Sequence, residues 1–340
     1  MSSKLDTISQ HSTLIDSQSW LFRRNPVYKP FRYPFAYEAW LQQQRLHWLP
    51  EEVSMAEDLR DWNFHLSPSE KNLLTQIFRF FTQMDVEVGE CYLKTYCRYF
   101  EPIEIKMMFA AFVNIESIHI AGYAHLLDSL GISEVEYQAF FQYKEMKDKW
   151  EYMQDFCNPQ SVSDMAMTLA VFSAFTEGLQ LFASFAILLN FPRFNKMKGM
   201  GQIVTWSVRD ETLHVHSLMQ LFHIMVQEHP HIWTPELQEA ITNAGREIVK
   251  HEDAFVDLAF EQGELQGLTA AEVKNYVRFI ADRRLDQLGL PKIYHISENP
   301  LPWMDSLLMG VEFSNFFETR ATEYSKASTT GTWNDVFGNE

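Results

Sequence analysis

Apolar residues recur at helical spacing along most of the chain. Four stretches are much longer than an average helix, at about residues 67–100, 102–131, 161–191 and 196–229. Ser67 and Pro68 form an N-cap and a first-turn proline, Ser161 begins the third stretch, and Gly131 is a typical C-terminal stop. The pattern therefore predicts four long helices packed side by side.

Shorter helical patterns flank these four stretches. An aromatic-rich segment from about residue 20 leads into a helix that ends near Trp48, and further helices are predicted at about 235–265, 269–288 and 304–319. We expect an all-α fold with one helical domain at 20–319, a flexible N-terminus at 1–19 and a flexible tail at 320–340.

The composition narrows the class of protein. A net charge of −17 disfavours nucleic acid and anionic membranes as partners. The three cysteines form no C-x-x-C pattern, and residues 1–19 lack the features of a signal peptide, so we expect a cytoplasmic protein with reduced thiols. Residues 165–191 are apolar enough for a membrane span, but Glu177 and Gln180 near the middle favour a buried core helix over a membrane helix.

A repeated phrase points to metal chemistry. The chain contains Glu116-Ser-Ile-His119 and Glu211-Thr-Leu-His214, each inside a long helical stretch. Three residues advance a helix by about 300°, so the carboxylate and the imidazole of each pair point the same way, one turn apart. Two such helices, joined by single carboxylates from two others, form the ligand set of ferritin-like di-iron and di-manganese bundles.

Two further carboxylates complete this set. Asp85 and Glu177 interrupt apolar runs in the first and third stretches, where a buried carboxylate must be protonated, be paired with a cation or bind a metal ion. The predicted ligands are Asp85, Glu116, His119, Glu177, Glu211 and His214. They suit two iron ions best, although a mixed manganese–iron pair or two manganese ions accept the same ligands. His125 and His216 lie on other helix faces and receive no role.

Three motifs then resemble one family, the small (beta) subunit of class I ribonucleotide reductase. They are Glu116-Ser-Ile-His119-Ile-Ala-Gly-Tyr123, Arg209-Asp210-Glu211-Thr212-Leu213-His214 and Trp48-Leu49-Pro50-Glu51-Glu52. The resemblance covers most of the chain. It implies a dinuclear metal centre that activates O₂ and forms a tyrosyl radical at Tyr123. Seven residues make about 700° on a helix, so Tyr123 returns to the side of Glu116.

The resemblance also implies how the radical is used. It implies a chain from His119 through Asp210 and Trp48 to the surface, and a radical-relay role for Tyr324 near the C-terminus. The tail would dock on the large (alpha) subunit, which reduces ribonucleotides to deoxyribonucleotides, with Trp333, Val336 and Phe337 as its apolar anchors. A homodimer is expected on the same ground.

The residues leave other functions open. Phe185 and Leu181 are placed to shield Tyr123 from water, but Ser207 stands where another apolar wall residue is expected. A ferritin-like oxidase or desaturase would use the same six ligands without needing Tyr123, Trp48 and Tyr324 together. An iron-storage bundle or a metal-free scaffold remain further alternatives.

Overall fold

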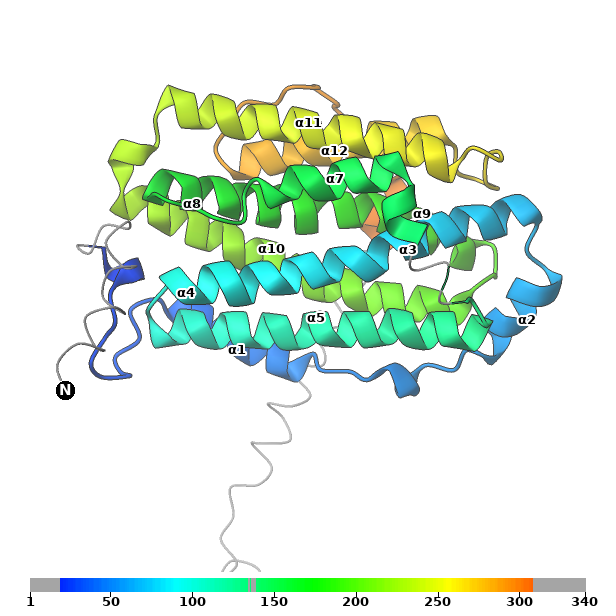
Figure 1. Ribbon diagram of the computed structural model, residues 1–340, viewed down its shortest axis with the longest axis horizontal. Coiled ribbons are helices and arrows are strands. Elements are labelled where there is room, and N and C mark those ends of the chain that lie inside the picture. The colour runs from blue at the N-terminus through cyan, green and yellow to red at the C-terminus, as the bar shows by residue number, and fades with distance from the viewer. Residues whose placement is uncertain (1–18, 134, 136–138, 308–340) are drawn as a thin grey trace, which may run out of the picture. The chain divides into compact units, whose positions relative to one another are not determined.

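Four long helical rods form the centre of the protein in the computed structural model (Figure 1). The structure describes residues 19–133, 135 and 139–307. The first rod is α3 (Pro68–Glu90), η4 (Cys91–Tyr96) and α4 (Cys97–Tyr99), and the second is α5 (Ile103–Leu130). The third rod is α8 (Val162–Leu169), η6 (Ala170–Gln180) and α9 (Leu181–Arg193), and the fourth is α10 (Lys198–Glu228).

Shorter helices flank the rods. They are α1 (Pro34–Arg45), α2 (Ala56–Phe64), α7 (Lys144–Gln154), α11 (Pro235–Ala259) and α12 (Ala270–Gln287), with single 3₁₀ turns at η2 (Trp20–Phe22), η3 (Pro50–Glu52), η5 (Ala139–Gln142) and η7 (Pro230–Ile232). The α1 helix packs on α5, while α11 and α12 pair with each other and cover η6 (Figure 1). No strand occurs among the described residues, so the predicted all-α class is confirmed.

The helix ends follow local sequence signals. The Ser67 hydroxyl accepts from the Glu70 N–H, and the Glu70 carboxylate accepts from the Ser67 N–H, which together form a capping box. The Ser161 hydroxyl caps α8, and Gly131 ends α5 at a φ of 71°, a left-handed conformation that glycine adopts without strain. The predicted bounds of the four long helices are therefore confirmed to within a few residues.

Two rods contain π-helical segments that the periodicity did not predict. They are η4 in the first rod and η6 in the third. In η6 the Thr176 hydroxyl donates to the carbonyl of Val171, five residues earlier, at 3.1 Å. A π turn adds one residue to a helical turn, a change too small to alter an apolar pattern over thirty residues. The helices α2 and α7 were also not predicted.

The third rod forms the centre of the core. Every residue from Thr168 to Phe191 is buried. Two helices, 103–130 and 162–193, are long and apolar enough to cross a membrane, but the apolar window of the second is 100% buried inside the protein. Packing within the bundle therefore accounts for the apolarity of this rod, as a core helix requires.

The chain divides into two compact units, 1–300 and 301–340. Of the second unit the structure describes residues 301–307, which include the start of the helix expected at 304–319. The predicted tail, with Tyr324, Trp333, Val336 and Phe337, lies outside the described residues, as does most of the flexible N-terminus predicted at 1–19.

Candidate metal centre

The structure brings all six predicted ligands together at the middle of the bundle. Asp85 comes from α3, Glu116 and His119 from α5, Glu177 from η6, and Glu211 and His214 from α10. None of these side chains is more than 2% exposed. Each of the four rods thus contributes to one buried cluster, because the period of each helix turns these residues to the inner side.

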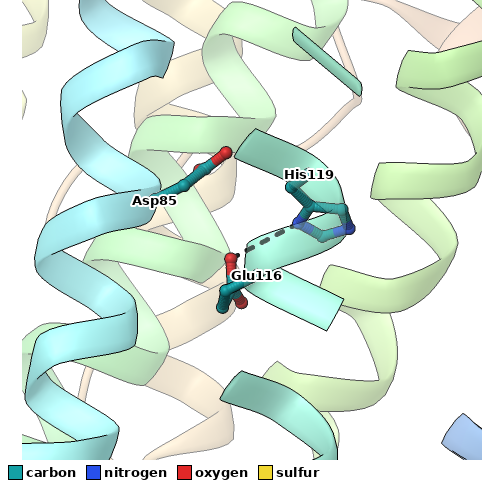
Figure 2. A group of neighbouring side chains, drawn as sticks. All are labelled: Asp85, Glu116 and His119. Carbon is teal, nitrogen blue, oxygen red and sulfur yellow. Dashed lines mark ion pairs between the residues drawn. The ribbon is translucent and has the colours of Figure 1, made fainter. Parts of the chain in front are cut away.

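The cluster divides into two groups that share one carboxylate. Asp85, Glu116 and His119 form the first group, and Glu116, Glu177 and His214 the second, with the candidate ligand atoms of each within 4.8 Å of one another. Figure 2 shows Asp85 on α3 beside Glu116 and His119 on α5. A carboxylate shared by two such groups is the arrangement expected of a bridging ligand between two metal ions.

Both Glu-x-x-His glutamates lie between the two imidazoles. The two oxygens of Glu116 lie 3.0 Å from Nδ1 of His214 and 3.4 Å from Nδ1 of His119. Those of Glu211 lie 3.3 Å from Nδ1 of His119 and 3.5 Å from Nδ1 of His214. Each glutamate thus offers one oxygen toward each histidine, and both histidines present Nδ1 to the centre.

Unpartnered polar atoms show that these residues fit metal ions. Oδ2 of Asp85, both carboxylate oxygens of Glu116 and Glu211, and both ring nitrogens of His214 are buried without a hydrogen bond. Buried polar atoms are almost always hydrogen-bonded, so such a concentration indicates a missing partner. Carboxylate oxygens and imidazole nitrogens are ligands that iron and manganese accept.

The pKa shifts of the clustered carboxylates also favour a bound cation. Burial and the nearby Glu116 raise the pKa of Asp85 well above its usual value, and burial and Glu211 do the same to the pKa of Glu177. Burial alone would raise the pKa of Glu116 too, but contacts with His119 and His214 lower it to about 2. Added positive charge at the centre would therefore favour the ionised forms of Asp85 and Glu177.

Tyr123 lies beside this cluster in an apolar pocket. Its side chain is 2% exposed, and its hydroxyl donates to Oγ of Ser207 at 3.1 Å. The Phe81 ring lies 4.9 Å from the Tyr123 ring and stacks on Phe185, so Phe185 shields Tyr123 through Phe81. Burial and the charge of Asp85 raise the pKa of Tyr123 above its usual value. The departure at Ser207 thus supplies a hydrogen bond where the sequence suggested a gap in the wall.

A hydrogen-bonded chain leads away from His119. Oδ2 of Asp210 lies 3.3 Å from Nε2 of His119 and accepts from Nε1 of Trp48 at 2.9 Å. In the tautomer that leaves Nδ1 of His119 free for a metal ion, its Nε2–H donates to Asp210. Gln43 donates to the other carboxylate oxygen at 3.2 Å, which fixes the orientation of Asp210. All three members of the predicted chain are therefore in contact.

Tyr92 also belongs to the centre, although it was not predicted from the sequence. Its hydroxyl donates to Glu177 at 2.8 Å, and its side chain is 0% exposed. One signal was available, because Tyr92 follows Asp85 by seven residues, the same spacing that separates Tyr123 from Glu116. His125 is half-buried and His216 is exposed.

The fold and the cluster together define a helical bundle with a buried carboxylate–histidine cluster of the kind that holds two metal ions, and the comparisons give its family. The model of the ribonucleotide reductase small chain matches residues 25–300. A probable ribonucleoside-diphosphate reductase small subunit of Invertebrate iridescent virus 3 is 44% identical over 324 residues, which cover 90% of this chain and 86% of that protein. The chain therefore belongs to the ribonucleotide reductase small-chain family and is the small subunit of an oxidoreductase.

Solved structures agree on the fold. The ribonucleotide reductase R2 subunit of Clostridium botulinum matches with a TM-score of 0.76 at 21% identity, covering 81% of this chain and 88% of that one. A ribonucleotide reductase homodimer of Saccharomyces cerevisiae matches with a TM-score of 0.72 at 18% identity, covering 95% and 96%. The family uses a dinuclear metal centre, and a small subunit implies a large-subunit partner.

Proposed function

We propose that this chain generates a tyrosyl radical at Tyr123 and passes it to the large subunit to start ribonucleotide reduction. The observation that carries the proposal is the pair of glutamates, Glu116 and Glu211, each set between the Nδ1 atoms of His119 and His214. Two carboxylates, each shared between two imidazoles, would suit a pair of metal ions. Asp85 and Glu177 complete one ion position each.

Iron is the proposed metal, with mixed manganese–iron and dimanganese centres as alternatives that the same ligands accept. When bound, a metal pair would supply, with O₂ as the oxidant, the oxidising power that removes one electron and one proton from a neighbouring phenol. Tyr123 is the proposed donor because it is buried beside Asp85 and shielded by Phe81. Burial favours a neutral radical, so oxidation of Tyr123 must release the hydroxyl proton, which lies on the hydrogen bond to Ser207.

The proposed route for the oxidising equivalent runs through His119, Asp210 and Trp48. Asp210 holds the His119 ring and the Trp48 indole on one carboxylate oxygen, which orders the chain without intervening water. Tyr324 and the tail at 320–340 are the proposed continuation to the large subunit, and they lie outside the described residues.

A second copy of this chain is the proposed partner on the outer face of α5. The exposed residues of its middle part are Ala110, Asn114, Ser117, Ile120, Ala121 and Ala124. All are uncharged and most are small, on a chain with a net charge of −17. A charge-free strip about 22 Å long allows close packing of two such helices, as a homodimer requires. We propose a cytoplasmic site of action and no binding to nucleic acid or membranes.

The test of the radical site compares wild type with Tyr123→Phe after reconstitution with ferrous iron and O₂. We expect an organic radical in the electron paramagnetic resonance spectrum of wild type and its loss in Tyr123→Phe. Tyr276→Phe, which alters a buried tyrosine on α12, is the control and should keep the signal. An unchanged radical in Tyr123→Phe would remove that residue from its role.

The test of the tail is a deletion of residues 325–340. We expect the radical to form normally while affinity for the large subunit falls, because the deleted segment carries the proposed apolar anchors Trp333, Val336 and Phe337. Equal affinity of the full and shortened chains would exclude the tail as the docking segment.

A further inference from the structure

Tyr92 is a second tyrosine of the metal centre, next to Glu177. Its hydroxyl donates to both carboxylate oxygens of Glu177, at 2.8 Å to Oε1 and 3.2 Å to Oε2. The first rod carries both Asp85, on α3, and Tyr92, on η4, seven residues apart, just as α5 carries Glu116 and Tyr123. Because seven residues make about two turns, each helix presents one carboxylate and one phenol to the same side.

The bond between Tyr92 and Glu177 joins the two π-helical segments found in the described part of the chain. Tyr92 belongs to η4 and Glu177 to η6. π-Helical turns are rare and are frequently found at functional sites. Two of them that meet through a buried phenol–carboxylate bond indicate that both rods are shaped to bring these two side chains together.

Packing holds the Tyr92 ring in place. The ring centroid lies 5.9 Å from that of Phe112, 5.8 Å from Phe109 and 5.5 Å from Tyr96. It also lies edge-on to the imidazole of His214, 6.2 Å away. A ring enclosed on these sides cannot swing its hydroxyl to another acceptor, so the donor that faces Glu177 is fixed in advance.

This fixed donor acts on one ion position only. Oε1 of Glu177 accepts the shorter bond from Tyr92, while Oε2 lies 3.8 Å from Nδ1 of His214, on the side of the second group. At the other ion position, one oxygen of Asp85 has no hydrogen-bond partner. The hydrogen bond from outside the ligand set is made there by Asp210 to His119. Each ion position therefore has one outer partner, which orients a carboxylate at one position and an imidazole at the other.

We propose that Tyr92 is a positioning residue for the metal ion held by Glu116, Glu177 and His214. Its hydroxyl makes the shorter of its two bonds to Oε1 of Glu177 and orients the carboxylate so that Oε2, on the side of His214, would be the oxygen that holds the ion. This proposal rests on the proposed dinuclear centre. It predicts that loss of the hydroxyl weakens one ion position selectively.

The experiment measures metal binding by Tyr92→Phe, which keeps the ring and removes the hydroxyl. Purified protein is titrated anaerobically with Fe(II), and separately with Mn(II), in the presence of a competing chelator. We expect the affinity of one of the two ions to fall by roughly 10- to 100-fold, with the other ion bound as in wild type. An unchanged affinity for both ions would overturn the proposal.

Tyr96→Phe is the matched control. Tyr96 lies in the same π-helical segment, is 1% exposed, and its hydroxyl donates to the backbone carbonyl of Thr168 rather than to a predicted ligand. It should bind both ions as wild type does, and an equal loss in the two variants would show a merely structural effect. A wild-type protein that binds fewer than two ions would contradict the dinuclear centre itself, which separates that failure from failure of the role of Tyr92.

If Tyr92→Phe does not fold, a second measurement on the wild-type protein tests the same hydrogen bond. Wild type labelled with ring-¹³C tyrosine is examined by infrared difference spectroscopy before and after Mn(II) is added. We expect the phenol C–O band to shift, because the charge on the accepting carboxylate changes, and the shift should persist in Tyr96→Phe. Absence of a shift would also overturn the proposal.

Discussion

The hydroxyl of Ser207 is hydrogen-bonded to the proposed radical site, Tyr123, and its removal tests the geometry there. Ser207 accepts from Tyr123 at 3.1 Å and donates to the carbonyl of Ile203 at 3.1 Å. In Ser207→Ala the Tyr123 hydroxyl stays buried but loses this acceptor. A buried donor left without a partner costs about 1–3 kcal/mol, so we expect the free energy of unfolding to fall by that amount.

Ser217→Ala provides the control on the same helix. Ser217 is equally buried and also donates to the carbonyl four residues earlier, that of Leu213, at 2.8 Å. Both substitutions replace a serine by a better helix former, a gain of about 0.5 kcal/mol that they share. The difference between the two variants therefore isolates the bond from Tyr123, and we expect Ser217→Ala to be close to neutral.

A double-mutant cycle measures the coupling energy between Ser207 and Tyr123. Urea unfolding of the metal-free protein is measured for wild type, Ser207→Ala, Tyr123→Phe and the double variant. We expect a coupling energy of about 1 kcal/mol or more, because Tyr123→Phe removes the donor that Ser207→Ala would leave unpaired. Coupling below about 0.5 kcal/mol, the limit for independent sites, would refute the hydrogen bond.

The same bond bears on the proposed radical. The phenol donates a hydrogen bond that the radical lacks, so the bond stabilises the reduced tyrosine by about 1 kcal/mol, which corresponds to about 40 mV for one electron. We expect the reduction potential of the Tyr123 radical to be lower by that amount in Ser207→Ala, measured by redox titration of the radical signal.

Three further predictions concern the relay, the metal ligands and the core. Asp210→Asn should leave the radical signal intact but abolish reduction of ribonucleotides by the reconstituted enzyme. An amide has one accepting atom, so if its oxygen faces Trp48 and His119, its NH₂ group meets the donating Nε2 of Gln43; full turnover would contradict this role. Burial raises the pKa values of Asp85 and Glu177. In the metal-free protein, the stability that their protonated forms contribute is therefore lost as the pH rises through those raised pKa values. A metal ion that binds these carboxylates must displace their protons. Affinity for Mn(II), measured by chelator competition, should therefore increase as the pH is raised, and a flat profile would contradict the protonated metal-free site. Lys149→Met should lower the free energy of unfolding, measured in urea, by about 3–5 kcal/mol, because it leaves Glu252 with a fully buried, unpaired charge. The double variant with Glu252→Leu should regain most of that free energy.

The long helices were predictable because their signals are local. Ser67, Glu70 and Gly131 act through bonds to residues within one turn, and the apolar period extends over many turns. The helix at Lys144–Gln154 was missed because its sequence is mostly polar and only three of its residues, Met146, Lys149 and Met153, are buried. Its buried lysine pairs with Glu252 on α11, a partner more than a hundred residues away.

The candidate ligands were predictable for a related reason. An ionised carboxylate inside an apolar run is costly enough to be conspicuous in any sequence, and helix geometry places the residues of each Glu-x-x-His pair on one side. The sequence did not show which carboxylates lie between the histidines. That depends on the rotation of α5 and α10 about their own axes, which packing against the other rods sets.

The sequence by itself determined the fold class, the four long helices, the six candidate ligands and the position of Tyr123 beside them. All of these follow from the period of a helix and the cost of burying charge, which operate within one element. Only the tertiary structure decided that Ser207 binds Tyr123, that Tyr92 binds Glu177, and that two rods widen into π-helical segments. Such pairings form between rods, and a hydrogen bond of 3 Å depends on rotations and shifts smaller than one residue, which no pattern along a single chain records.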